Sequence, residues 1–211
     1  MLKLYDYFRS SASYRVRIAL NLKGIRYERI TVDLLKDEEV AAGYLKINPQ
    51  GLVPALQLED GTILTQSIAI LEWIEATYTE PPLLSRDAPM AASVRQIVNL
   101  IACDIHPLNN RRVLRYLQDE LGVDDNQKTD WYQHWIHKNF PALEELVRAE
   151  PFALGAECSL ADVVIVPQVF NALRFEVDMS AYTKILSIYN HCNKIQAFAD
   201  AHPKTSASAK R

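Results

Sequence analysis

The chain has 211 residues, of which 49% are hydrophobic and 23% are charged, as is usual for a globular protein of one large or two small domains. Its formal net charge of −3 is too small to indicate a nucleic acid or an anionic membrane surface as a partner. The start has no basic segment followed by an apolar one, and no apolar run is long enough to cross a membrane, so we expect neither a signal peptide nor a spanning helix.

Residues 1–80 show the periodicities of a small domain that mixes strands and helices. Runs rich in apolar and aromatic residues predict strands, and apolar residues at helical spacing predict helices that start at serines and end at Gly24 or at Pro81-Pro82. The predicted elements are a strand at 2–7, a helix at 14–24, a strand at 27–34, a strand at 52–56, a hairpin at 57–64 and a helix at 68–78. The order is therefore β-α-β followed, after a charged connection, by β-β-α.

The chain after residue 88 has helical periodicity and no convincing strand. The prolines and polar residues at 79–88 predict a linker between a first domain at 1–80 and an all-helical second domain at 88–211. Pro107 predicts a break or a bend in the first helical stretch. The predicted helical stretches are 90–121, 128–150, 159–175 and 185–201.

The cysteines and histidines favour neither a disulfide framework nor a metal site. Cys103, Cys158 and Cys192 are few, widely spaced and odd in number, so we expect free thiols in a reducing compartment. That expectation makes the cytoplasm the default location. The histidines show no ligand pattern beyond the pair His134 and His137, which we interpret as part of an exposed helix face.

Two helix starts in the first domain are candidates for binding an anion. One follows the serines Ser10, Ser11 and Ser13, and the other follows Gln66 and Ser67. The free N–H groups and the positive dipole end of a helix attract a carboxylate, a phosphate or a thiolate. Simple helix capping is the more ordinary explanation of the same serines, and the glycine spacing of a phosphate loop is absent.

Three further features suggest an unusual backbone or polar chemistry. Pro54 interrupts a strand-like run, so this strand must lie at an edge or contain an unusual peptide bond. The segment His106–Arg112 holds one histidine, two asparagines and two arginines, which either form a site or a solvated helix face. Arg174 stands among apolar residues and is either a snorkelling surface residue or a planar clamp for a carboxylate.

Together these motifs resemble the zeta class of the glutathione transferases over nearly the whole chain, and within it the bacterial maleylacetoacetate and maleylpyruvate isomerase group. The matching segments are SSASYRVRIALNLKG at 10–24, NPQGLVPAL at 48–56, TQSIAILEWIE at 65–75, IHPLNNRRVL at 105–114, SLADVVIVPQVFNALRF at 159–175 and HP at 202–203. The resemblance implies the glutathione transferase fold, with an α/β thioredoxin-like N-terminal domain of order βαβ-ββα and an all-α C-terminal domain. It also implies that Ser159 and Asp162 form a helix-capping box with a role in folding.

The resemblance implies glutathione as the cofactor. Ser10 would hydrogen-bond the glutathione sulfur. Pro54 would be a cis-proline that lets the Val53 backbone pair with the cysteinyl unit, and Gln66 and Ser67 would hold the γ-glutamyl carboxylate. The implied cofactor-binding residues are Ser10, Ser11, Ser13, Val53, Pro54, Gln66, Ser67, His106, Asn110, Arg111 and Arg112.

The implied reaction is addition of the glutathione thiolate to a conjugated double bond, rotation about the resulting single bond, and departure of the thiol with trans geometry. Arginine forks suit the two carboxylates of a small keto diacid. His106 is expected to act as a polar positioning group rather than a base. Ala12 stands where class members often carry cysteine, so the nucleophile must come from the cofactor. The implied catalytic residues are Ser10, Ser11, Arg9, His106, Arg112 and Arg174.

The leading interpretation is isomerisation of maleylacetoacetate to fumarylacetoacetate in tyrosine and phenylalanine catabolism. The alternatives are maleylpyruvate isomerisation in gentisate degradation, and transferase or dehalogenase activity on small α-halo acids. A non-catalytic protein that only binds a partner is disfavoured because the serines and Gln66-Ser67 are present. The resemblance also implies a homodimer, with a small dicarboxylic keto acid and glutathione as its small-molecule partners.

Overall fold

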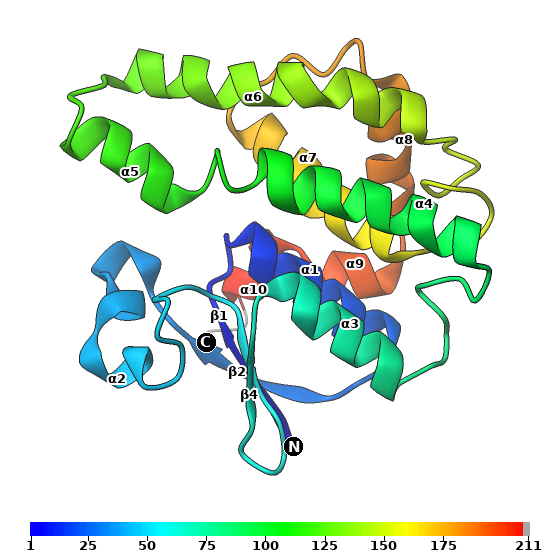
Figure 1. Ribbon diagram of the computed structural model, residues 1–211, viewed down its shortest axis with the longest axis horizontal. Coiled ribbons are helices and arrows are strands. Elements are labelled where there is room, and N and C mark those ends of the chain that lie inside the picture. The colour runs from blue at the N-terminus through cyan, green and yellow to red at the C-terminus, as the bar shows by residue number, and fades with distance from the viewer. Residues whose placement is uncertain (209–211) are drawn as a thin grey trace. The chain divides into compact units, whose positions relative to one another are not determined.

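The computed structural model describes residues 1–208 and divides the chain into two compact units. The first comprises Met1–Pro82 and the segment from Asn193 onward, and the second comprises Leu83–Cys192. Residues 209–211, at the end of the predicted second domain, lie outside the described part. The predicted fold class is confirmed, since the first unit holds a mixed sheet with helices and the second is predominantly helical (Figure 1).

The first unit is built on a four-stranded sheet of order β2-β1-β3-β4. β1 is parallel to β2 and antiparallel to β3, and β3 and β4 form the predicted hairpin with Asp60 and Gly61 in its turn. β3 starts after Pro54, which has no N–H to give to the ladder. The elements of this unit are β1 (Leu2–Asp6), α1 (Ser11–Leu22), β2 (Tyr27–Thr31), η1 (Leu34–Lys36), η2 (Glu38–Val40), α2 (Ala42–Leu45), β3 (Ala55–Gln57), β4 (Ile63–Thr65), α3 (Ser67–Thr77), α9 (Gln196–Ala201) and α10 (Pro203–Ser208).

The register of the sheet brings three segments that are distant in the sequence to the same end of its strands. Ala55, the first residue of β3, pairs with Tyr5 near the end of β1 and with Thr65 at the end of β4. The chain that follows β1, the chain that precedes β3 and the chain that follows β4 therefore all leave the sheet at the same end. These segments carry the serine cluster, the Val53-Pro54 pair and the start of α3.

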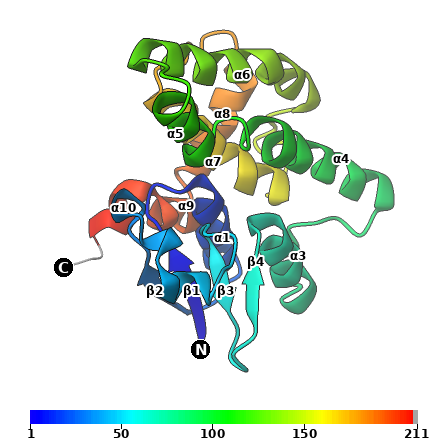
Figure 2. The same ribbon diagram turned by 60° about the vertical axis from the view of Figure 1, so that its left-hand side comes forward.

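Two helices of the first unit pack against α1. α3 lies beside α1, and α9, although far away in the sequence, packs on α1 as well (Figures 1 and 2). Asn21 of α1 donates its side-chain amide to the carbonyl of Ala197 at 3.0 Å, and Arg17 donates Nε–H to the carbonyl of Ala201 at 3.0 Å. The C-terminal segment is therefore tied to the helix that begins at the serine cluster.

The stretch predicted as one helix over 185–201 is two helices. α8 ends at Cys192, and α9 begins at Gln196. The apolar periodicity runs through the break because Cys192 and Phe198 are both buried, the first in the helical unit and the second in the sheet-containing unit. Periodicity identifies the positions that face a core, but it does not tell which core they join.

The second unit is a bundle of helices around α7. All residues from Leu160 to Val169 are buried, and α7 packs against α4, α8 and η3. The predicted capping box is confirmed, because Asp162 accepts a hydrogen bond from the Ser159 backbone N–H at 2.9 Å and Ser159 caps the helix in return. The elements of this unit are α4 (Ala88–Asn99), η3 (Leu100–Ile105), α5 (Arg111–Asp119), α6 (Asp125–Leu146), α7 (Leu160–Arg174) and α8 (Thr183–Cys192).

The first helical stretch of the second unit changes its geometry just before His106. η3 is a π-helical turn, in which the His106 N–H bonds the carbonyl of Ile101 at 2.9 Å. Pro107 follows and has no N–H with which to continue a helical ladder. The predicted interruption near Pro107 is confirmed. Single π-turns within helices are frequent at functional sites.

Candidate functional site

Ser10 is the N-cap of α1 and keeps a proton that it can donate. Its Oγ accepts a hydrogen bond from the Ser13 backbone N–H at 3.2 Å, which is the capping interaction considered from the sequence. Accepting this bond uses a lone pair, so the hydroxyl proton is left for a second partner. Ser10 is half-buried, whereas Ser11 and Ser13 are buried. Capping and the activation of a thiol are therefore compatible roles for the same hydroxyl.

The loop in front of Ser10 is held from inside the unit. Arg17, which is only 1% exposed, donates Nη2–H to the carbonyl of Phe8 at 3.0 Å. The exposed Arg9 side chain rests on the Phe8 ring, with 5.1 Å between its guanidinium carbon and the ring centroid. The loop that carries Arg9 and Ser10 thus has its backbone fixed and its arginine head in solvent.

The Val53-Pro54 peptide bond is cis, as the resemblance implies. The β1–β3 ladder ends at Ala55, so the N–H and C=O of Val53 lie beyond it. The segment before Val53 is anchored at the Leu52 carbonyl, which accepts hydrogen bonds from the Tyr44 hydroxyl and the Asn48 amide, each at 2.7 Å. This anchoring presents the Val53 backbone as an edge that an extended peptide can pair with.

Gly51 allows this loop to fold, and we expect Gly51→Ala to destabilise the protein more than Gly24→Ala does. Both glycines have positive φ, +61° and +65°, which costs a non-glycine residue about 1 kcal/mol. A Cβ at Gly51 would also lie 3.1 Å from the Glu39 carbonyl oxygen, whereas a Cβ at Gly24 meets nothing within 4 Å. Urea unfolding measures the difference. Equal losses for the two variants would show that the close approach at Gly51 has no consequence.

Gln66 and Ser67 form the start of α3 with an unusual backbone. Gln66 has φ +66° and ψ 114°, a conformation that a residue with a side chain seldom adopts and that only its surroundings can maintain. Its exposed side-chain amide donates to Gln50 Oε1 at 2.6 Å. Ser67 is buried, and its Oγ accepts a hydrogen bond from the guanidinium of Arg15 at 3.2 Å. Strain of this kind concentrates at binding sites, which makes Gln66 a candidate ligand contact.

A buried ionic cluster lies behind the serine cluster. The Asp6 carboxylate, 1% exposed, is bonded by Arg17 at 2.6 Å and also by Arg29. Burial lowers the pKa of the Arg17 guanidinium, and the adjacent Asp6 charge opposes that change. Because one carboxylate faces two guanidinium groups, the cluster keeps an excess of positive charge near the start of α1.

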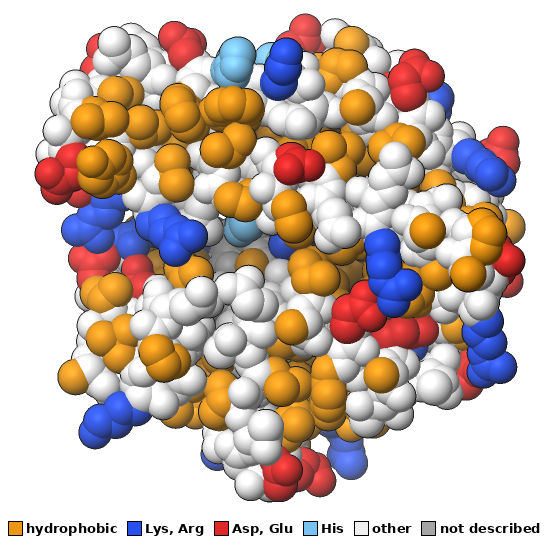
Figure 3. Space-filling view, viewed as in Figure 1, with side chains coloured by type: hydrophobic (Ala, Val, Ile, Leu, Met, Phe, Trp, Pro, Cys, Tyr) orange, Lys and Arg blue, Asp and Glu red, His pale blue; other side chains and the backbone are white. Residues whose placement is uncertain are grey.

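In the second unit, His106 and Asn110 lie on either side of the turn that follows the π-helical segment. Asn110 caps α5 by accepting from the Arg112 N–H at 3.1 Å, and its amide nitrogen faces His106 Nε2 at 3.5 Å. Arg111 and Arg112 occupy the first turn of α5, where a positive charge opposes the helix dipole. On the face in Figure 3, basic side chains gather near α5. The helix dipole disfavours cations in the first turn, so their presence there favours a functional explanation over a stabilising one.

Arg174 and the turn at 106–110 are both connected to α6. Trp131 donates its indole N–H to the Leu108 carbonyl at 2.9 Å. Its neighbour Tyr132 stacks on Phe175, with 3.8 Å between the ring centroids, and the Arg174 guanidinium lies over the same Phe175 ring. The Arg174 side chain is exposed. Two adjacent residues of α6 therefore contact the turn that precedes Arg111 and Arg112 and the ring on which Arg174 rests.

Sequence reasoning did not single out the charged residues that lie behind the site. Arg15 and Arg17 are buried and bond Ser67 and the Phe8 carbonyl, and Asp6 is the buried partner of Arg17. The neutral Asn48 is buried as well and bonds the Leu52 carbonyl. The available signal was the pair of arginines within the apolar periodicity of α1. A charge in a buried position needs a partner, so an arginine within such a periodicity predicts a buried carboxylate or hydrogen-bond acceptor nearby.

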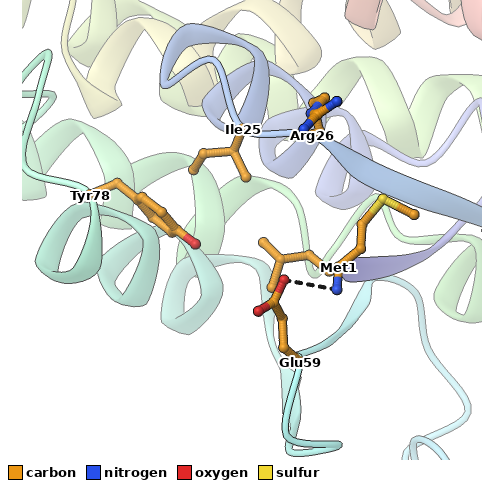
Figure 4. Close-up of a pocket in the computed structure, with 6 residues that line it drawn as sticks. Met1, Ile25, Arg26, Glu59 and Tyr78 are labelled. Carbon is orange, nitrogen blue, oxygen red and sulfur yellow. Dashed lines mark ion pairs between the residues drawn. The ribbon is translucent and has the colours of Figure 1, made fainter.

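A separate pocket of about 360 Å³ is lined by residues at the start of β1 and at the β3–β4 turn (Figure 4). Because the serine cluster follows the other end of β1, the pocket lies at the opposite end of the sheet. An ion pair between the Met1 ammonium and Glu59 spans 2.8 Å within it, but both groups are largely exposed. Such a pair contributes little. None of the lining residues was predicted as a site residue. They are Met1, Leu2, Ile25, Arg26, Glu59 and Tyr78.

Residues 1–208 contain neither a membrane-spanning helix nor a cluster of metal ligands. No helix in that range combines the length and the apolar character needed to cross a membrane. No group of three or more histidine, cysteine or carboxylate side chains in the same range is arranged to hold a metal ion. The cysteines in this range form no disulfide, and burial raises the pKa of the Cys158 and Cys192 thiols.

Comparison with known proteins agrees with this fold. Residues 9–77 match the family model for the N-terminal domain of glutathione S-transferases. The chain is 43% identical to the maleylacetoacetate isomerase of Pseudomonas aeruginosa, covering 96% of both proteins. It is 42% identical to the maleylpyruvate isomerase of a Ralstonia species, covering 96% of this chain and 97% of the relative.

The solved structures give the same result. A holo structure of a maleylpyruvate isomerase, described as a bacterial zeta-class glutathione S-transferase, superposes with a TM-score of 0.93 at 42% identity and covers 96% of this chain and 97% of its own. A maleylacetoacetate isomerase from Methylobacterium extorquens AM1, crystallised with malonate and glutathione, gives a TM-score of 0.92 at 36% identity, with 96% and 97% covered. This chain belongs to the glutathione S-transferase family and, within it, to the zeta class.

Proposed function

We propose that this protein is a glutathione-dependent cis–trans isomerase that converts maleylacetoacetate to fumarylacetoacetate. The observation that carries the proposal is the high identity, over nearly the full length, to relatives named for this reaction. The first unit has the local geometry to bind a thiol-containing peptide, and the second has cations to bind a diacid. Transferase activity on other electrophiles accompanies this proposal, as the zeta-class membership suggests.

The residues of the first unit fit glutathione as the cofactor. The Val53 backbone edge suits the cysteinyl unit, and the Gln66 amide and the Ser67 hydroxyl suit the γ-glutamyl carboxylate. The amide groups at the start of α3 add N–H donors for the same carboxylate. Ser10 directs its hydroxyl proton to the sulfur and favours the thiolate over the thiol. When bound, glutathione supplies the nucleophile that opens the double bond to rotation.

We assign binding of the substrate carboxylates to Arg9, Arg112 and Arg174. All three guanidinium groups are exposed and permanently charged, and a guanidinium can hold a carboxylate with two parallel hydrogen bonds. His106, Asn110 and Arg111 provide further donors where negative charge develops on the ketone oxygen. The interaction between Asn110 and His106 Nε2 favours a donor role for the opposite ring nitrogen, in line with positioning rather than base catalysis.

Maleylpyruvate is the second candidate substrate. The Ralstonia relative and the structure with a TM-score of 0.93 both carry the name of that activity, at the same 42% identity. The two substrates share the maleyl group and differ in the chain beyond the ketone. Both make the same demands on the thiol and on the arginines, so they compete for one proposed site.

The two proposals are separated by isomerisation of maleylacetone, a shortened analogue of maleylacetoacetate, and of maleylpyruvate by the purified protein in the presence of glutathione. We expect turnover of both, with the higher kcat/KM for maleylacetone. A higher value for maleylpyruvate would assign the protein to gentisate degradation. Failure to turn over either substrate, in a protein that binds glutathione, would contradict isomerase function and favour conjugation of α-halo acids.

We further propose that the protein acts as a cytoplasmic homodimer in tyrosine and phenylalanine catabolism. The free cysteines support the proposed location, and the family resemblance supports the dimer and the pathway. Sedimentation equilibrium at several protein concentrations tests this proposal. A dimer should have a molecular mass of about twice the 24.0 kDa of the chain. A mass that stays at that of one chain would contradict it.

A further inference from the structure

Arg15 connects the interior of the first unit to the start of α3. It lies in the second turn of α1 and is 1% exposed, so its charged head is removed from solvent. One of its terminal N–H groups donates to Ser67 Oγ at 3.2 Å, and Ser67 is itself only 6% exposed. Arg15 lies within the segment 10–24 that matches the family, but it is not among the residues predicted or proposed to contact glutathione or the substrate.

This hydrogen bond decides what the Ser67 hydroxyl can do. A serine hydroxyl can accept as well as donate, but it has only one proton. Because guanidinium can only donate, the Ser67 oxygen must accept from Arg15, and the hydroxyl proton is directed to another partner. A hydroxyl held in this way can donate its proton to an anionic oxygen and is poorly placed to accept from an N–H group.

The charge of Arg15 acts in the same direction. A guanidinium stays protonated at any physiological pH, and its field is screened less inside a protein than in water. The N-terminal end of α3, with its unpaired N–H groups and positive dipole, lies at the same residue. The buried cation, the oriented hydroxyl and the helix terminus together favour a carboxylate over a neutral group.

We propose that Arg15 is a positioning residue for recognition of the γ-glutamyl α-carboxylate, which it serves through Ser67 rather than by touching the ligand. The inference rests on the proposed function, since it requires glutathione to bind at the start of α3. It adds a specificity determinant from the protein interior: the preference for a peptide that bears a free carboxylate next to its terminal amine.

The alternative is a purely structural role, in which Arg15 only ties α1 to α3. The chain offers a matched control for that role. Lys23, near the end of α1, makes an ion pair with Glu75 of α3 at 2.6 Å, and its side chain is fully buried. Lys23→Met therefore removes a buried α1–α3 connection at the other end of the helix pair without changing Ser67.

The test is calorimetric measurement of ligand affinity with two probes, glutathione and γ-aminobutyryl-cysteinyl-glycine, which lacks the α-carboxylate. For Arg15→Met we expect the Kd for glutathione to rise about 10-fold, as for loss of a charge-assisted interaction, and the Kd for the analogue to change by less than about 3-fold. Lys23→Met is expected to lower the unfolding midpoint and to leave both affinities unchanged. Arg15→Lys, which keeps a donor and the charge, is expected to recover part of the loss.

A double-mutant cycle shows whether Arg15 acts through Ser67. In a Ser67→Ala background, Arg15→Met is expected to weaken glutathione binding by less than about 3-fold, because the hydroxyl that it orients is gone. Equal losses for the two probes, or the same loss in both backgrounds, would overturn the positioning role while leaving glutathione binding intact. If Arg15→Met does not fold, the Kd values of Arg15→Lys and of the wild type for the two probes are compared instead. Equal changes in Kd for both probes would again overturn the positioning role. Absence of glutathione binding by the wild type would contradict the proposed function itself.

Discussion

Replacing Ser10 by alanine is expected to lower kcat/KM for glutathione-dependent isomerisation by about 100-fold, the usual loss when a hydrogen-bond donor to developing negative charge is removed. The hydroxyl of Ser10 caps α1 through a lone pair and has its proton free to stabilise a thiolate. Without that donor the thiol of bound glutathione should ionise at higher pH. The rising limb of the pH–rate profile should therefore move to higher pH, because the reactive form is the deprotonated one.

Loss of the cap must be separated from loss of the donor. Ser10→Ala also removes the acceptor for the Ser13 N–H, at a cost of about 1 kcal/mol in stability. Ser10→Asp keeps a capping acceptor but has no proton to donate when ionised, so it should remain stable and lose activity. Ser10→Thr keeps both functions and should retain most of the activity. If Ser10→Asp were as active as Ser10→Thr, thiol activation by this hydroxyl would be ruled out.

Replacing Asp6 by asparagine is expected to destabilise the protein by about 3–5 kcal/mol, the range for removing one partner of a buried ion pair. The Asp6 carboxylate is the shared partner of Arg17 and Arg29, and both Asp6 and Arg17 are only 1% exposed. Its removal leaves two guanidinium groups facing each other without a counter-charge. Because Arg17 also holds the Phe8 carbonyl, the loop that carries Ser10 should lose its order as well. Urea unfolding measures the loss of stability, and the affinity for glutathione reports the loss of order in the loop.

The same pair of strands supplies a control for Asp6. Lys3 of β1 and Glu28 of β2 form an exposed ion pair at 3.7 Å. Glu28→Gln removes a carboxylate from this exposed pair and should cost less than about 1 kcal/mol. A similar loss for the two substitutions would mean that burial of the Asp6 cluster contributes nothing. An apolar replacement of all three residues of the cluster should be less damaging than Asp6→Asn alone, because no charge is then left unpaired.

Much of the first unit could be predicted because its signals are local. Serines before an apolar periodicity mark the starts of α1 and α3, and Asp60-Gly61 marks the hairpin turn. The capping box at Ser159 is equally local, since its two partners are three residues apart. For these elements, side chains a few positions away decide the backbone conformation.

The remainder depends on contacts that no local pattern records. Arg17 bonds the carbonyl of Ala201, 184 positions further along the chain, and this contact shows why α9 packs with the first unit. Arg15 and Ser67 are 52 positions apart. The positive φ of Gln66 has no sequence signal either, because the residue type gives no reason for it. The site residues could therefore be named from the resemblance, but the buried charges that orient them could not.

The most direct test of the central claim is isomerisation of maleylacetone with glutathione or with S-methylglutathione as the only added peptide. The account predicts turnover with glutathione and none with S-methylglutathione, which should still bind and should inhibit the reaction when both are present. Blocking the sulfur leaves the carboxylate and the backbone contacts available, so binding and chemistry are separated. Isomerisation at a comparable rate with S-methylglutathione, or with no peptide, would contradict a mechanism in which the protein activates a bound thiol.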